Sequence, residues 1–147
     1  MSYLAILALV AGAAIATQAS INAQLGVMLK SSLLGTTVAF SCSFLFTLLA
    51  VIASTKHYPQ AEEIRSIPVY FWFAGGALSA FGVALFYYLI PKMGVGPMMS
   101  YALTGQMVIA VIASHFGWFD LPVKHIQPAQ LIGLIALING VILINLD

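Results

Sequence analysis

Two amide side chains in the first apolar stretch are the residues best suited to bind a ligand. Gln18 and Asn22 are four residues apart in a run, residues 4–29, that carries no charge before Lys30. Because an α-helix turns about 100° per residue, the two amides share one face, which Gly26 continues. Hydrocarbon offers amides no hydrogen-bond partner, so we expect this helix to lie inside a bundle. Neutral amides both donate and accept, which favours polar, weakly charged or zwitterionic cargo.

A second polar face lies on the same stretch. Thr17, Ser20 and Gln24 fall roughly 120–160° away from the first face by helical periodicity. Two interpretations remain open for these three side chains. They either form hydrogen bonds between helices, each worth about 1 kcal/mol or less, or they line a water-filled cavity.

The fourth apolar run adds two candidate binding residues. Gln106 lies well inside that run and therefore needs a partner or water, and Tyr101 lies beside it. We expect the two amides of the first run to line a substrate cavity together with Gln106 and Tyr101.

Composition places the chain in a membrane. Its 147 residues are 62% hydrophobic and only 6% charged, and the mean hydropathy is +1.05. A net charge of +1 offers no basic surface for nucleic acid. The single cysteine, Cys42, cannot form an internal disulfide. Because Met-Ser-Tyr supplies no basic leader region, we expect the first apolar run to be a retained span rather than a signal peptide.

Five apolar runs are long enough to cross about 30 Å of hydrocarbon. They predict an all-α integral membrane protein with one transmembrane domain over residues 1–147. The predicted spans are residues 3–29, 33–54, 68–90, 97–116 and 129–146. Residues 55–67 form the longest predicted polar loop, and residues 91–96, PKMGVG, form a tight connection.

Small residues at helical spacing predict close helix packing. They allow two helix backbones to approach each other, either within the chain or across a dimer interface. The residues predicted to pack in this way are Gly26, Gly75, Gly76, Ser79, Ala80, Gly133 and Gly140.

The charges fix the orientation only weakly. Five spans place the N-terminus, Lys56, Arg65 and Lys124 on one side, and Lys30 and Lys92 on the other. The positive-inside rule therefore favours a cytoplasmic N-terminus by three charges to two. So small a bias also allows insertion in both orientations.

Three features make the chain resemble the YdcZ-like family of the drug/metabolite transporter superfamily. They are the first-run pattern G-x5-Q-x3-N-x-Q-L-G from residue 12, the stretch GGALSAFGV from residue 75, and GQMVIAVIASHFGWFDLP from residue 105. The resemblance covers essentially the whole chain. It places Gln18, Asn22, Gly75, Gly76, Gly105 and Gln106 on the family's motif positions.

The resemblance implies a half-size transporter of the bacterial inner membrane. Such a chain would supply one half of a 5+5 inverted-repeat architecture and would work as an antiparallel homodimer or with a paired homologous subunit. One position departs from the family pattern, because Ser114 stands where an acidic residue usually precedes HFG. The predicted spans then contain no charged residue, which argues against carrying over proton coupling.

Two functions from different classes remain. The first is a transporter of a small polar or weakly charged organic molecule, either an exporter or a facilitator. The alternative is a non-transporting accessory or regulatory subunit. An enzyme is the weakest reading, because the sequence has no acid pair and its histidines, His57, His115 and His125, are dispersed. We expect no cofactor and no metal, and a channel would need a ring of charges or a carbonyl filter that the sequence does not suggest.

Overall fold

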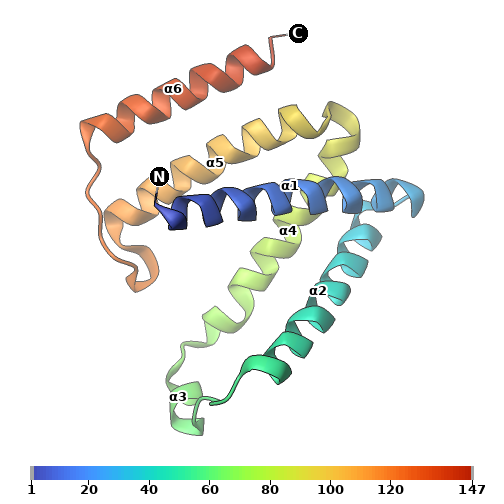
Figure 1. The fold of residues 1–147 in the computed structure, drawn as a ribbon, viewed down its shortest axis with the longest axis vertical. Coiled ribbons are helices and arrows are strands. Elements are labelled where there is room, and N and C mark those ends of the chain that lie inside the picture. The colour runs from blue at the N-terminus through green and yellow to red at the C-terminus, as the bar shows by residue number, and fades with distance from the viewer. Residues whose placement is uncertain (1, 147) are drawn as a thin grey trace. The chain divides into compact units, whose positions relative to one another are not determined.

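The computed structural model describes residues 2–146, and this part of the chain is helical with no strand (Figure 1). Its elements are α1 (Tyr3–Met28), α2 (Ser32–Ser54), α3 (Ala61–Ser66), α4 (Val69–Met93), α5 (Val95–Phe116), a 3-10 turn (Trp118–Asp120) and α6 (Pro128–Ile144). The all-α prediction is confirmed. Contacts divide the chain into two compact units, one up to Lys92 and one from Met93 onward.

The number of long spans differs from the prediction. Four described helices, α1, α2, α4 and α5, are long and apolar enough to cross a membrane, whereas α6 has only 17 residues. The structure therefore shows four of the five predicted spans as helices of that length. α6 begins one residue before the predicted span, where the Gln127 N–H donates to the Gln130 side chain, and it ends two residues early, before Asn145.

The boundaries around Pro91 also need correction. Residues 91–96 were predicted to form a connection, but α4 continues through Pro91 to Met93 and α5 already begins at Val95. Proline has no N–H, so Pro91 cannot donate to the Tyr87 carbonyl one turn earlier, yet the helix continues for two residues beyond it. Gly94 alone joins the two helices, with a φ of +89° that favours glycine. Lys92 thus lies inside the last turn of α4.

The predicted polar loop contains a short helix. Within residues 55–67, the chain forms α3, whose first turn is capped where the Gln60 amide N–H donates to Glu63 Oε2 at 2.8 Å. The capping box of Gln60 and Glu63 marks the start of this six-residue helix, which lies outside the apolar runs.

A tight turn fixes how α1 leads into α2. The Ser31 N–H donates to the Gly26 carbonyl at 2.9 Å, and the Lys30 N–H donates to the Val27 carbonyl at 3.0 Å. This Schellman pattern places Lys30 in the left-handed region, with φ of 54°. The Ser31 hydroxyl then accepts from the Leu34 N–H at 3.3 Å and caps α2.

The first unit has its core where α1, α2 and the end of α4 meet. A Cβ built on Gly35 would lie 2.9 Å from Gly26 Cα, so the α1 and α2 backbones touch at these two glycines. The buried apolar side chains of this unit are Ala19, Ala23, Ala39, Tyr87 and Ile90. The remaining apolar surface of its helices faces outward, as expected for spans that meet lipid or another chain.

In the second unit, α6 packs along α5 and is tied to it near both ends. At the C-terminal end of α5, the Lys124 N–H donates to the Ser114 carbonyl at 2.9 Å, and the Ile126 N–H donates to His115 Nδ1 at 3.3 Å. Near the other end of α5, the Asn145 side-chain amide donates to the Ser100 hydroxyl at 3.0 Å. The two helices therefore run side by side over most of their lengths.

Candidate functional site

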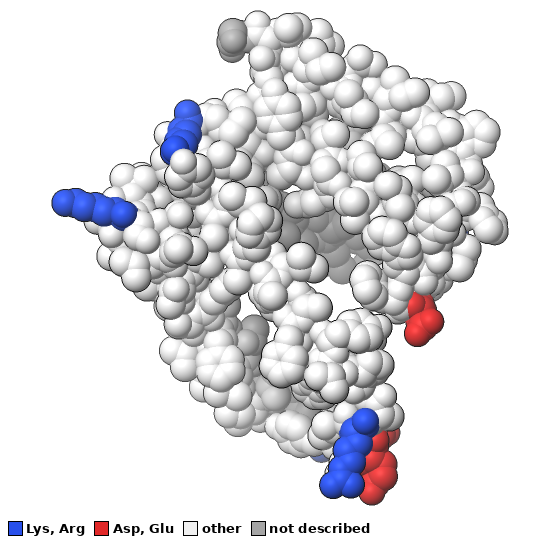
Figure 2. All heavy atoms as spheres, turned by 180° about the vertical axis from the view of Figure 1, so that it is seen from behind, with Lys and Arg blue, Asp and Glu red and all other residues white. Residues whose placement is uncertain are grey.

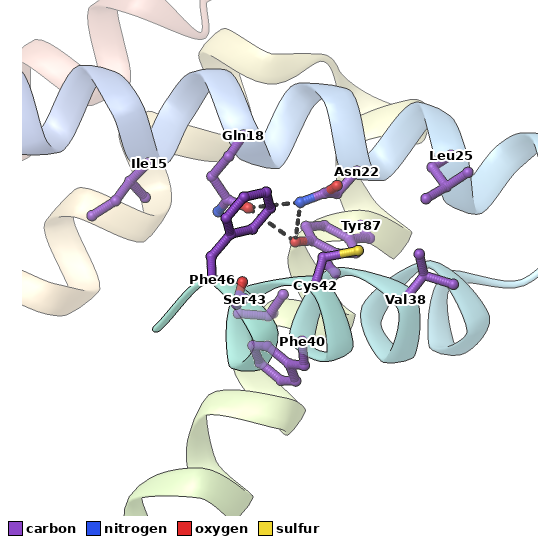
Figure 3. Close-up of a pocket in the computed structure, with 12 residues that line it drawn as sticks. Ile15, Gln18, Asn22, Leu25, Val38, Phe40, Cys42, Ser43, Phe46 and Tyr87 are labelled. Carbon is purple, nitrogen blue, oxygen red and sulfur yellow. Dashed lines mark hydrogen bonds between the residues drawn. The ribbon is translucent and has the colours of Figure 1, made fainter. Parts of the chain in front are cut away.

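Three side chains of the first unit form a closed hydrogen-bonded triangle (Figure 3). Asn22 Nδ2 donates to Gln18 Oε1 at 2.8 Å and to Tyr87 Oη at 2.9 Å. The Tyr87 hydroxyl donates to the same Gln18 oxygen at 3.1 Å. The spacing of four residues that predicted a shared face for Gln18 and Asn22 thus brings the two amides into direct contact.

The triangle leaves one donor group and one acceptor group without a protein partner. Both N–H bonds of Asn22 and the Tyr87 hydroxyl hydrogen are used inside it. Gln18 Nε2 and Asn22 Oδ1 make no hydrogen bond to the described residues. A pair of amides held in this way presents two N–H donors and a carbonyl acceptor next to each other.

These three side chains line one cavity of about 540 Å³ between α1, α2 and α4 (Figure 3). The other lining residues are Ile15, Leu25, Val38, Ala39, Phe40, Cys42, Ser43, Phe46 and Val83. The wall is therefore mostly apolar, with a few polar groups gathered on one side. Pockets for small organic ligands usually have this character and volumes of about 300–1,000 Å³.

No charged side chain lines this cavity. A strongly charged ligand would find no counter-charge among these residues, and burying it there would be costly. The chemistry of the lining favours recognition by neutral hydrogen bonds and by apolar contact.

Tyr87 is the site residue that sequence reasoning missed. A tyrosine near the end of an apolar run is typical of the aromatic belt at a membrane interface, but the Tyr87 side chain is only 2% exposed. A signal was present, because Tyr87 lies four, seven and eleven residues after Val83, Ala80 and Gly76. These spacings place it on the small-residue face of the helix rather than on a lipid-facing one.

The second polar face of α1 has a local explanation for two of its members. The Thr17 hydroxyl donates to the Ala13 carbonyl at 2.9 Å, and the Ser20 hydroxyl donates to the Ala16 carbonyl at 2.8 Å. Both hydroxyls are therefore satisfied by their own helix, a common arrangement for Ser and Thr. Gln24 is exposed and makes no side-chain hydrogen bond to the described residues.

Gln106 and Tyr101 lie on α5, in the second unit, and do not line the cavity described above. Gln106 is exposed and has no hydrogen bond to the described residues, and Tyr101 is 53% exposed. A role for either residue in binding substrate stays a prediction.

The predicted packing residues fall into two groups. Gly26 lies in the close contact between α1 and α2. By contrast, a Cβ built on Gly75, Gly76, Gly133 or Gly140 would meet nothing within 4 Å among the described residues. Ser79 and Ala80 are likewise exposed, so the small-residue face of α4 has no partner helix among the described residues of the first unit.

One comparison with known proteins identifies a family. The model of a family described as an inner membrane exporter, YdcZ, matches residues 3–143. No curated protein and no solved structure matches the chain. The matched range contains all of α1, α2, α4 and α5 and all but the end of α6.

Proposed function

Because the chain belongs to the YdcZ family of inner-membrane exporters, we propose that it carries a small polar organic molecule that binds at Gln18 and Asn22. Membrane transport is the role of the family, and the inner membrane is its location. The observation that carries the proposal is the triangle with Tyr87, which leaves Gln18 Nε2 and Asn22 Oδ1 unbonded beside a cavity of about 540 Å³.

The cargo would combine an amide-like polar group with an apolar part. A ligand acceptor would receive the Gln18 N–H bonds, and an adjacent ligand donor would bond the Asn22 carbonyl oxygen. The apolar wall, with Phe40 and Phe46 on α2, would contact the rest of the molecule. Neutral or zwitterionic compounds fit this lining better than ions with one strong charge.

We further propose that α6 is a fifth, short span. At about 1.5 Å per residue, its 17 residues reach roughly 25 Å, at the lower limit for crossing hydrocarbon. Its sequence carries no charge. The bonds of His115 with Ile126 and of Ser100 with Asn145 hold it along α5, so α6 would cross wherever α5 crosses.

Five spans per chain would suit an antiparallel homodimer, or a pair with a homologous subunit. Two chains of opposite orientation would supply the inverted halves between which many carriers hold their substrate. The exposed α4 face with Gly75, Gly76, Ser79 and Ala80 supports this assembly, because small residues allow a second helix to approach closely.

Ligand binding by purified protein tests the site. We expect neutral amides and zwitterionic amino acids to raise the thermal unfolding midpoint, and quaternary ammonium ions and dicarboxylates to have little effect. Gln18→Ala and Asn22→Ala should abolish the shift and the flux of the best compound into proteoliposomes. Gln24→Ala is the matched control, because it also removes a glutamine side chain from α1, but one that does not line the cavity.

Three outcomes would change the proposal. If Gln18→Ala and Asn22→Ala lose folding or assembly, the triangle is structural. If Gln24→Ala is as damaging as Gln18→Ala, the cavity is not the site. If the wild-type protein alone moves nothing across liposomes, the accessory-subunit function takes precedence.

Cys42 gives an independent readout of the same cavity. It is the only cysteine in the sequence and it lines the cavity. A thiol reacts with maleimides as the thiolate, which requires water. We expect N-ethylmaleimide to label Cys42 in proteoliposomes, and a compound that binds at Gln18 and Asn22 to slow the labelling.

A further inference from the structure

A second, smaller cavity of the first unit lies where the α1–α2 turn meets the end of α4. Its volume is about 210 Å³, and Lys30, Ser31, Ser32, Tyr88 and Lys92 are among its lining residues. This volume is below the range of about 300–1,000 Å³ that is usual for whole organic ligands. The cavity therefore suits a group the size of a small anion or a lipid headgroup.

Two ammonium groups at this cavity have no acidic partner. Neither Lys30 nor Lys92 forms an ion pair with the described residues, and the acidic residues of the first unit, Glu62 and Glu63, are both on α3. At about 1.5 Å per residue, α2 separates α3 from the α1–α2 turn by roughly 35 Å. Figure 2 shows basic side chains without an acidic neighbour at the edge where α1 meets α2.

The exposed Lys92 side chain contacts the Tyr88 side chain one turn earlier. Its Nζ donates to the Tyr88 hydroxyl and lies 3.8 Å from the centroid of the Tyr88 ring. An ammonium group has three N–H donors, so two remain for a ligand. Because the Lys92 side chain is already restricted by this contact, a ligand that binds it loses less free energy to side-chain ordering.

Lys30 occupies a backbone position that favours glycine. Its φ of 54° is left-handed, which costs a side chain such as lysine about 1 kcal/mol relative to glycine. A lysine here reduces the stability of the turn. A cation in this place is consistent with a binding role that offsets the cost.

Both lysines stand at the end of a membrane-spanning helix. Lys30 follows α1 directly and Lys92 is in the last turn of α4. Such positions lie at the depth of lipid headgroups, where phosphate groups are concentrated and basic side chains gain about 1 kcal/mol each. The ligand chemistry that fits two cations with serine and tyrosine hydroxyls beside them is a phosphate group.

We propose that this cavity binds a phosphate group through Lys30 and Lys92. The phosphate comes either from an anionic phospholipid or from a free phosphate compound. The site is distinct from the amide cavity, and Tyr87, which lines both, separates them. Its occupancy does not depend on whether the chain transports anything.

Thermal unfolding of delipidated protein in neutral detergent tests the proposal. We expect phosphatidylglycerol to raise the unfolding midpoint at low salt and phosphatidylcholine to have little effect. Inorganic phosphate and glycerol 3-phosphate form the second arm. A response to phosphatidylglycerol alone assigns the site to a lipid headgroup, whereas a response to both arms assigns it to phosphate from either source. If neither phosphatidylglycerol nor the phosphate compounds raise the unfolding midpoint, the proposal is overturned.

Paired variants locate the site. Lys30→Gln with Lys92→Gln should weaken the binding of phosphatidylglycerol roughly thirtyfold. Lys56→Gln with Arg65→Gln removes the same charge from the loop and α3 that follow α2, away from the cavity, and should leave binding unchanged. Equal losses in the two pairs would mean non-specific attraction and would overturn the site.

Lys30→Gly separates binding from folding. Glycine relieves the left-handed backbone and removes the charge, so the variant should unfold at a higher midpoint without lipid and yet respond less to phosphatidylglycerol. A variant that keeps the full response would show that Lys30 is not a ligand.

Discussion

At the residue scale, Gln18 accepts two hydrogen bonds at one oxygen while its nitrogen has no partner in the described chain. Tyr87 and Asn22 together fix the amide in this orientation. A glutamine held by its oxygen presents its nitrogen to the cavity, so the triangle determines which half of the amide a ligand meets.

Tyr87→Phe should therefore weaken both folding and recognition. It removes one donor and one acceptor from the triangle, and we expect a loss of about 0.5–1.5 kcal/mol in unfolding free energy, measured by denaturation in sodium dodecyl sulfate. Ligand affinity should fall as well, because the Gln18 amide gains freedom to rotate. Tyr88→Phe is the neighbouring control, since Tyr88 does not line the amide cavity, and an equal loss of ligand affinity in that variant would contradict the assignment.

The sequence predicted two of the three side chains of this triangle. Gln18 and Asn22 were identified because two amides at helical spacing stand out in an apolar run. Tyr87 comes from a helix 65 residues farther along, and local periodicity cannot pair distant helices. Helical periodicity shows which residues share a face of one helix. Which residue of another helix contacts that face depends on tertiary packing, which the local pattern does not contain.

At the element scale, two glycines determine how α1 and α2 meet. A Cβ on Gly35 would overlap the backbone of Gly26, and backbone atoms cannot move aside as a flexible side chain can. Sequence patterns located both helices to within a residue or two of their ends. They placed the end of α4 too early, because residues 91–96 were predicted to be a connection, whereas the helix continues through Pro91 to Met93.

Gly35→Ala should destabilise the protein by about 1–3 kcal/mol, since the added methyl group forces the two helices apart. Gly76→Ala is the matched substitution on α4, where a Cβ meets nothing within 4 Å. In the monomer it should be neutral or stabilising by up to about 1 kcal/mol through helix propensity. Denaturation in sodium dodecyl sulfate measures the free energy of unfolding of both variants. An equal free energy of unfolding for Gly35→Ala and wild type would rule out the tight contact.

At the scale of the whole molecule, the four long helices expose far more apolar surface than they bury. If a second copy of opposite orientation covers the α4 face, both ends of the chain will be found on both sides of the membrane. Cysteines placed at Ser2 and Asp147 in a Cys42→Ala background should each label from either side, and the chain should cross-link to itself. Labelling of each end from one side only would exclude the antiparallel homodimer.

The absence of acidic residues from the five apolar helices has a consequence for energy coupling. Glu62 and Glu63 are on α3, and Asp120 follows α5, so none of the described acids lies in α1, α2, α4, α5 or α6. Proton coupling requires a group in the path whose protonation competes with cargo. If the chain transports as a homodimer, it should therefore move cargo only down its gradient, and a protonophore should leave flux into proteoliposomes unchanged. Uphill accumulation driven by a pH gradient would show that another group, such as a histidine, carries the proton.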